Sequence, residues 1–222
     1  FRQVRSMSKG NEEFYRLLLE NKHLNTNSLI YCSDARNVPT KDSTVDLIIT
    51  SPPYVTSYEY ADLHQLTALW MEYTKDLSDF RKRFIGTSYH SQKDIKLNSS
   101  IAENIKKELQ VKRRKVSEGV GTYFTEMNEV FIEAKRILKK KSKICIVIGN
   151  TKIAGVNILN AEVFEEQLIN LGFRIVETVK REIPSKNLPS TRDKTTGRFS
   201  SNENKNKTVA YPTEYIIIAE KE

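Results

Sequence analysis

The chain has 222 residues, of which 38% are hydrophobic, and this is enough for one domain with a buried core. Its 36 lysines and arginines outnumber its 28 aspartates and glutamates, which gives a net charge of +8. Cys32 and Cys145 lack Cys-x-x-Cys spacing, which excludes a disulfide framework and a cysteine zinc site and favours a reducing, cytoplasmic compartment. No apolar stretch reaches the roughly 18 residues of a membrane span, so we expect no membrane partner. We also expect no metal site.

The hydrophobic pattern predicts helices alternating with strands. A helix is predicted over 12–22, followed by a strand over 28–32 that ends at a polar turn. A second strand, over 45–50, must stop at Pro52 and Pro53, because proline has no N–H for a sheet ladder. The other predicted elements are helices over 62–73, 122–140 and 160–171, and strands over 142–149, 173–183 and 214–219.

These elements indicate an α/β fold. Helices separate most strands, and the central strands are continuously apolar, which is typical of a mostly parallel sheet with helices on both faces. The last two strands have no helix between them and are therefore predicted to form an antiparallel hairpin. We expect a single domain over 1–222, with a basic helical insertion at 75–118 and a polar basic loop at 185–211.

The positive charge is concentrated in two segments. Residues 104–118 and 184–211 each carry a net charge of +4, which accounts for the whole excess. Clustered cations suit the phosphates of nucleic acid, although a solvated helix face and a solvated loop would look the same. The candidate phosphate contacts are Lys112, Arg113, Arg114, Arg192 and Arg198.

The strand over 45–50 ends in the sequence Ser51-Pro52-Pro53-Tyr54. In open α/β sheets ligands bind beyond the carboxyl ends of strands. There the Ser51 hydroxyl and the Pro52 carbonyl would accept hydrogen bonds from the exocyclic amino group of a base and direct its lone pair. Tyr54 would stack on a base extruded from the duplex.

At these residues the chain resembles the DNA amino-methyltransferases, which modify cytosine N4 or adenine N6 using S-adenosylmethionine. The resemblance implies a Rossmann-like class I methyltransferase sheet in which Ser51, Pro52, Pro53 and Tyr54 are catalytic. It also implies that Asp34, at the end of the preceding strand, lies near the cofactor together with Ala35 and Thr50. In the aromatic segment after the motif, Tyr58 and Tyr60 are candidates for the base pocket.

The chain departs from this family in one respect. The Gly-rich cofactor turn, typically Phe-x-Gly-x-Gly after the first strand, is absent, and Gly119-Val-Gly121 is better read as a loop that starts a helix. We therefore expect the chain to be the C-terminal part of a methyltransferase, with the cofactor half encoded upstream or on a partner polypeptide. The first two strands of the sheet would be missing, and the chain alone would bind S-adenosylmethionine poorly.

Three functions follow from this interpretation. The first is methylation of double-stranded DNA in a restriction-modification system, with cytosine N4 favoured over adenine N6 because the motif begins with serine. The second is methylation of RNA or of a protein glutamine, for which related motifs usually begin with Asn or Asp. The third is a non-catalytic DNA-binding module. Methylation of a ring carbon is disfavoured because neither cysteine follows a proline.

Overall fold

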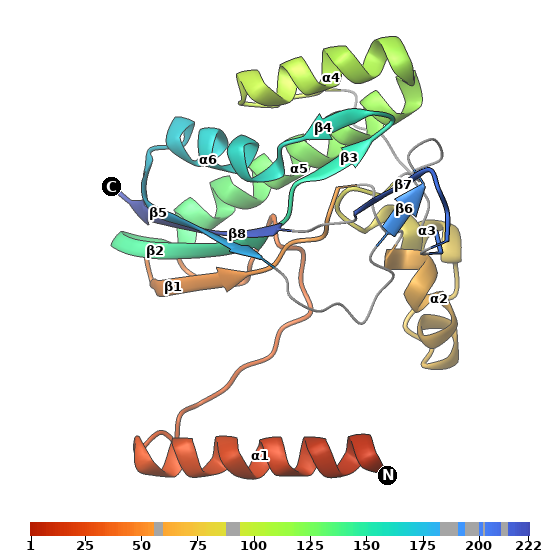
Figure 1. The fold of residues 1–222 in the computed structure, drawn as a ribbon. Coiled ribbons are helices and arrows are strands. Elements are labelled where there is room, and N and C mark those ends of the chain that lie inside the picture. The colour runs from red at the N-terminus through yellow and green to blue at the C-terminus, as the bar shows by residue number, and fades with distance from the viewer. Residues whose placement is uncertain (56–59, 88–93, 183–190, 194–199, 202, 210–212) are drawn as a thin grey trace. The chain divides into compact units, whose positions relative to one another are not determined.

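The computed structural model describes residues 1–55, 60–87, 94–182, 191–193, 200–201, 203–209 and 213–222 (Figure 1). The chain divides into two compact units, Phe1–Ser33 and Asp34–Glu222. The first unit, one helix with an extended tail, is not a domain by itself, because a domain has its own hydrophobic core. The expected single domain over 1–222 therefore stays a prediction.

The first unit consists of helix α1, Arg2–Glu20, and the segment that follows it. None of the residues of α1 is buried, and its apolar Phe14 and Leu17 are 61% and 56% exposed. The strand predicted over 28–32 is absent, so this prediction was wrong. A short apolar run becomes a strand where a neighbouring strand accepts its backbone hydrogen bonds, and residues 28–32 have no such neighbour among the described residues.

The second unit is built on a four-stranded sheet with the order β1-β2-β8-β5. Its strands are β1, Val45–Thr50, β2, Leu138–Ile148, β5, Phe173–Glu182, and β8, Thr213–Lys221. The pair β1–β2 is parallel, whereas β2–β8 and β5–β8 are antiparallel. The predicted antiparallel hairpin of the last two long strands is thus present. The described sheet has one parallel pair. The apolar runs from which we predicted a mostly parallel sheet indicate that a strand is buried, but they do not determine its direction.

Two helices cover one face of this sheet. Helix α5, Arg114–Ile137, packs on β2, and helix α6, Asn160–Asn170, packs on β5 and β8 (Figure 1). The core beneath them contains Ile144, Ile146 and Ile148 of β2 together with Ile217 and Ala219 of β8, all at most 1% exposed. Helix α4, Ser100–Lys112, packs in turn on α5.

Helix α5 begins at Arg114, so the loop predicted at Gly119–Gly121 is wrong. Both glycines lie inside the helix. A Cβ atom at Gly121 would lie 3.1 Å from the side chain of Lys106 on α4. A glycine inside α5 therefore indicates a close approach between two helices as well as a break in helical propensity.

The opposite face of the sheet exposes apolar side chains. Leu47 and Ile49, which point to this face from β1, are 53% and 71% exposed. On β2, Ile49 pairs with the half-buried Cys145 and Leu47 pairs with the exposed Lys143. Helices were predicted on both faces, and in the described part of the second unit the packed helices lie on one.

The remaining elements are short. Helices α2, Tyr60–Trp70, and α3, Leu77–Lys82, follow the motif, and two hairpins pair β3, Thr151–Ile153, with β4, Val156–Ile158, and β6, Thr191–Asp193, with β7, Lys207–Val209. Trp70, the last residue of α2, is 83% exposed. None of the described helices is both long and apolar enough to span a membrane.

Candidate active site

The Ser-Pro-Pro-Tyr motif lies at the carboxyl end of β1, as predicted. Thr50 is the last residue of this strand and pairs with Ile146 of β2. Because the two strands are parallel, their carboxyl ends meet at the same edge of the sheet, where α/β proteins bind ligands. Ser51 is exposed at this edge, Pro52 is buried, and Pro53 and Tyr54 are half-buried.

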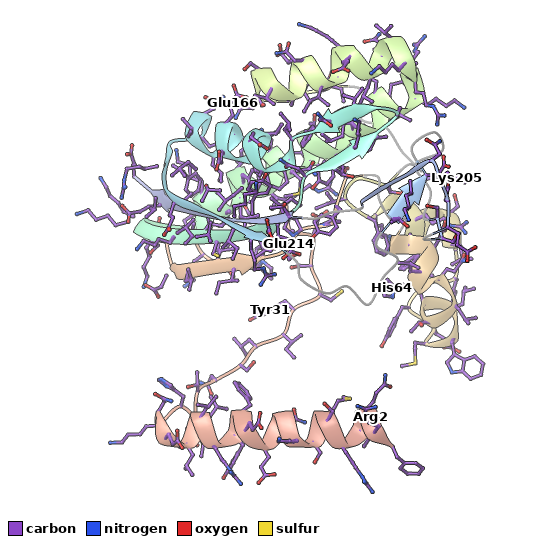
Figure 2. All side chains as sticks on the ribbon, viewed as in Figure 1. Arg2, Tyr31, His64, Glu166, Lys205 and Glu214 are labelled. Atoms are coloured by element: carbon purple, nitrogen blue, oxygen red, sulfur yellow. The ribbon has the colours of Figure 1, made fainter. Side chains whose placement is uncertain are left out.

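Two hydrogen bonds fix the second half of the motif. The hydroxyl of Tyr123 on α5 donates to the carbonyl of Pro53 at 2.7 Å. The hydroxyl of Tyr54 donates to Oε1 of Glu214 at 3.3 Å. Glu214 lies at the start of β8, and Figure 2 labels it. The ring of Tyr54 also packs against the core, so its predicted stacking on a base stays a prediction.

The first half of the motif contains two acceptor oxygens, on the exposed Ser51 and the buried Pro52. Among the described residues, no hydrogen bond outside the strand ladders uses the Ser51 hydroxyl or the Pro52 carbonyl. These two oxygen atoms are the acceptors that the sequence analysis proposed for the exocyclic amino group of a base. The sequence analysis did not identify Tyr123, for which a tyrosine inside the apolar part of a long helix was the available signal.

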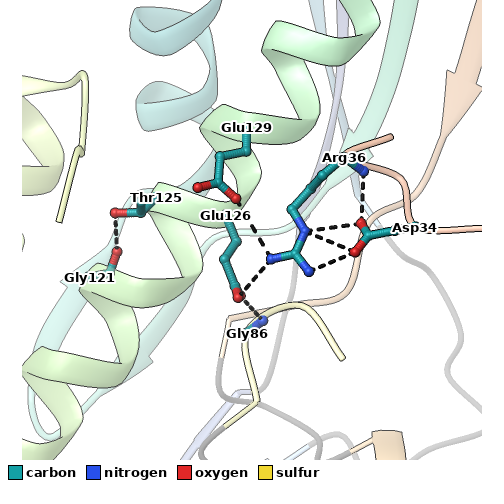
Figure 3. A network of polar contacts seen from close by, with 7 residues as sticks. All are labelled: Asp34, Arg36, Gly86, Gly121, Thr125, Glu126 and Glu129. Carbon is teal, nitrogen blue, oxygen red and sulfur yellow. Dashed lines mark hydrogen bonds and ion pairs between the residues drawn. The ribbon is translucent and has the colours of Figure 1, made fainter. Parts of the chain in front are cut away.

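The predicted cofactor residue Asp34 belongs to a polar network (Figure 3). Its carboxylate accepts hydrogen bonds from the backbone N–H of Arg36 at 2.9 Å, and from Nε and Nη2 of Arg36 at 3.0 and 2.7 Å. The Arg36 side chain thereby holds the pKa of Asp34 below its ordinary value. Asp34 does not follow a strand, contrary to the expectation, and the cofactor role of Asp34, Ala35 and Thr50 stays a prediction.

The network continues into α5. Arg36 Nη1 lies 3.2 Å from Oε1 of Glu126, whose side chain is 0% exposed, and 3.7 Å from Glu129. Glu126 Oε2 also accepts the backbone N–H of Gly86 at 2.6 Å. Arg36 and Glu126 were missed by the sequence analysis, although an acidic residue beside Phe124 and Met127 on an apolar helix face was a usable signal.

The predicted phosphate contacts are only partly described. Lys112, Arg113 and Arg114 are exposed at the junction of α4 and α5. Lys112 is paired with Glu108 and Arg114 with Glu118, both at 3.0 Å. Tyr58 and Arg198 lie outside the described residues. Tyr60 and Arg192 belong to α2 and β6, and their side chains also lie outside the description.

The described residues contain no group of three or more histidines, cysteines, aspartates or glutamates that could hold a metal ion. Among the described residues no Gly-rich turn follows a strand. The carboxylate of Asp34 is hydrogen-bonded to Arg36, and the Asp34 side chain stays 44% exposed. What the chain presents is a pair of acceptors at a strand end.

Comparison with known proteins shows the family of the chain. Residues 45–222 match the model of a DNA methylase family, and the chain belongs to this family. It is 22% identical over 195 residues to the type II methyltransferase M.MvaI of Kocuria varians, which covers 82% of this chain and 43% of the relative. It is 28% identical over 149 residues to the type II methyltransferase M.AvaI of Nostoc sp. strain PCC 7120, which covers 59% of this chain and 31% of the relative.

The chain thus spans less than half the length of these curated relatives. Among solved structures, it is similar to a predicted DNA modification methylase of Thermus thermophilus complexed with S-adenosyl-L-methionine. That similarity has a TM-score of 0.40 and 15% identity, and it covers 86% of this chain and 54% of the other.

Proposed function

We propose that the complete protein methylates an exocyclic amino group of a base in double-stranded DNA, in the cytoplasm and as part of a restriction-modification system. The observation that carries this proposal is the position of Ser51-Pro52-Pro53-Tyr54. In a member of a DNA methylase family, this motif leaves the carboxyl end of β1 with an exposed serine and two unengaged acceptors. Cytosine N4 is favoured over adenine N6 because the motif begins with serine.

The residues of the motif bind and orient the target. An exocyclic amino nitrogen is a poor nucleophile because its lone pair is delocalised into the ring. Hydrogen bonds from its two N–H groups to the Ser51 hydroxyl and the Pro52 carbonyl draw the nitrogen towards tetrahedral geometry and direct the lone pair outward. Tyr54 supports the face of the extruded base, and the exposed Lys112, Arg113 and Arg114 contact phosphates.

We further propose that S-adenosylmethionine, the methyl donor, is bound mainly by a cofactor half outside the described residues. In the described sheet β1 is an end strand, paired on one side only, and it exposes Leu47 and Ile49. An unpaired strand edge beside an uncovered apolar face is unfavourable in water. Additional strands next to β1 and a covering layer over this face would bury both, either from the same polypeptide or from a partner.

Isothermal titration calorimetry tests the cofactor half. We expect the 222-residue chain alone to bind S-adenosylmethionine at least about 100-fold more weakly than the complete protein, because the Gly-rich turn would contribute backbone contacts that the side chains described here do not replace. Equal affinity would contradict the proposal. Ile49→Ser is a useful variant, since it should weaken assembly with the cofactor half if that half covers this face.

Product analysis tests the reaction. The complete protein is incubated with duplex DNA, RNA and glutamine-containing peptides and with labelled S-adenosylmethionine, and the products are digested and identified by mass spectrometry. We expect label in DNA as N4-methylcytosine. N6-methyladenine would support amino-methylation and correct the base. Label in RNA or peptide, label on a ring carbon, or DNA binding without any transfer would each overturn the proposal.

A further inference from the structure

The diproline loop cannot be anchored by its own amides. Pro52 and Pro53 have no N–H groups, so the backbone at these residues offers hydrogen-bond acceptors alone. An acceptor carbonyl is held in place by a donor from another element, and for Pro53 this donor is the hydroxyl of Tyr123 at 2.7 Å. The two acceptors assigned to the amino group, on Ser51 and Pro52, come immediately before this anchored carbonyl.

The side chain of Tyr123 is itself rigidly placed. It is fully buried, and its ring lies 5.3 Å from the ring of Phe124 and 6.3 Å from that of Phe164. On another side it contacts Gly86, where an added Cβ atom would lie 2.6 Å from Cδ2 of Tyr123. Because packing fixes both side-chain torsions of the tyrosine, its hydroxyl is held at one position before any ligand binds.

The backbone of Gly86 is itself held in place by a hydrogen bond. Gly86 has a φ of +72°, which favours glycine, and its N–H donates to Oε2 of the buried Glu126 at 2.6 Å. Glu126 lies one helical turn after Tyr123 on α5, on the same side of the helix, and also contacts Arg36. Helix α5 therefore contacts the Pro53 carbonyl through Tyr123 and the segments of Gly86 and Arg36 through Glu126. Figure 3 shows the contacts of Glu126 with Gly86 and Arg36.

We propose that Tyr123 is a positioning residue for methyl transfer, an inference that rests on the proposed function. Its hydroxyl holds the Pro53 carbonyl, which keeps the Ser51 hydroxyl and the Pro52 carbonyl aligned towards the amino group of the target base. Gly86 acts through Tyr123 by leaving room for the ring. A misplacement of about 1 Å near a reacting group can reduce a rate about 100-fold, so the loss of one anchor has a measurable cost.

The test compares Tyr123→Phe with wild type in the complete enzyme. We expect kcat for DNA methylation to fall about tenfold while the KM for DNA stays within about twofold, since the hydroxyl aligns the motif without touching DNA. Hydrogen exchange at the amides of Tyr54 and Val55 should become about tenfold faster, with β1 unchanged. The control is Tyr73→Phe, on a tyrosine that is 71% exposed, and both variants are assayed well below their melting temperatures.

A second variant tests the same link without removing the hydroxyl. Gly86→Ala forces a methyl group against the Tyr123 ring, and it too should lower kcat. Gly155→Ala is its control, because Gly155 has a similar φ of +78° and the nearest atom to its added Cβ is Lys112 Nζ at 3.9 Å. If wild type methylates DNA and Tyr123→Phe keeps its kcat, or raises KM alone, the inference is overturned. If wild type transfers no methyl group to DNA, the proposed function has failed instead.

Discussion

At the scale of single residues, the second half of the motif is hydrogen-bonded within the protein, and the first half is the part proposed to bind the ligand. The Pro53 carbonyl accepts a bond from Tyr123, and the Tyr54 hydroxyl is directed towards Glu214. The exposed Ser51 hydroxyl remains at the edge of the sheet. This division gives distinct expectations for the serine, for the ring of the tyrosine and for its hydroxyl.

Substitutions at Tyr54 separate the ring from the hydroxyl. Stacking on a base is worth about 1–3 kcal/mol, so we expect Tyr54→Ala in the complete enzyme to lower kcat/KM at least about tenfold. Tyr54→Phe keeps the ring and loses the 3.3 Å contact with Glu214, and it should retain most of the activity. Steady-state methylation assays measure both. Equal loss in the two variants would show that the hydroxyl matters and the stacking does not.

Glu126 and Glu129 form a matched pair, because both face the guanidinium of Arg36. Glu126 is 0% exposed and Glu129 is 41% exposed. Glu126→Ala removes an ion-pair partner of Arg36 and the hydrogen-bond acceptor of the Gly86 N–H. We therefore expect this substitution to lower the free energy of unfolding by about 2 kcal/mol. Glu129→Ala should cost less than about 1 kcal/mol. Urea denaturation measures both, and a larger effect at Glu129 would contradict this ranking.

Parts of this network were predictable from the sequence, and parts were not. Ser51 to Tyr54 were identified because two prolines after an apolar run mark the end of a strand. Arg36 and Tyr123 were not, because their contacts depend on how α5 packs against the segments that contain Arg36 and Pro53. The resemblance to the family implied that Asp34 lies near the cofactor at the end of a strand, and that strand is absent.

At the scale of elements, α4 is attached to α6 by one carboxylate. Glu166 of α6 accepts hydrogen bonds from the hydroxyls of Ser99 and Ser100 at 2.5 and 2.7 Å and from the N–H of Ile101 at 3.1 Å. Ser99 is also the N-cap of α4, where it accepts the N–H of Ala102 at 3.0 Å. The side chain thus joins the start of one helix to the face of another.

This contact predicts an acid-sensitive contribution to stability. Burial raises the pKa of Glu166, but the hydrogen bonds from Ser99, Ser100 and Ile101 outweigh it and lower the pKa from 4.5 to about 2. Because the folded-state pKa is the lower one, the stabilisation is complete above the unfolded value and is lost as the pH falls from about 4.5 to about 2.

We therefore expect Glu166→Gln to destabilise the protein at neutral pH and to differ little from wild type at pH values near 2. Denaturant unfolding at a series of pH values measures the difference. Glu103→Gln, at an exposed position in the first turn of α4, is the control. A difference between Glu166→Gln and wild type that does not shrink with acidification would contradict the assignment.

The junction of α4 and α5 carries a prediction about DNA binding. Lys112 and Arg114 make exposed pairs with Glu108 and Glu118, which contribute little and are readily exchanged for phosphate. If Arg113 and Arg114 contact phosphates, replacing both with Gln should reduce the slope of log affinity against log salt by about 1–2. The exposed pair Lys75 and Lys82, replaced in the same way, should leave it unchanged. Equal slopes for wild type and the arginine variant would exclude the phosphate role.

The elements themselves were predictable where their apolar pattern was long. β1, β2, β5, β8 and α6 lie close to their predicted positions, because each has apolar residues that are buried in the core or packed against it. The hairpins β3–β4 and β6–β7 were not predicted, since three-residue strands carry too little pattern. The start of α5 was placed late because Gly119 and Gly121 were read as a loop.

At the scale of the whole molecule, the second unit presents a sheet with one covered face. The core side is buried under α5 and α6, while Leu47 and Ile49 on the other side remain exposed. The sequence pattern of these strands predicted burial on both faces. Both observations agree with the proposed cofactor half, which would add strands next to β1 and cover the exposed face.

The central claim is that Ser51 at the end of β1 holds the amino group that is methylated. Single-turnover methyl transfer to duplex DNA by the complete enzyme tests it most directly, comparing Ser51→Ala with wild type and with Ser78→Ala, an exposed serine on α3. We predict that Ser51→Ala lowers the rate at least about 100-fold, with DNA binding and melting temperature unchanged, while Ser78→Ala equals wild type. A Ser51→Ala rate within about twofold of wild type would contradict the account.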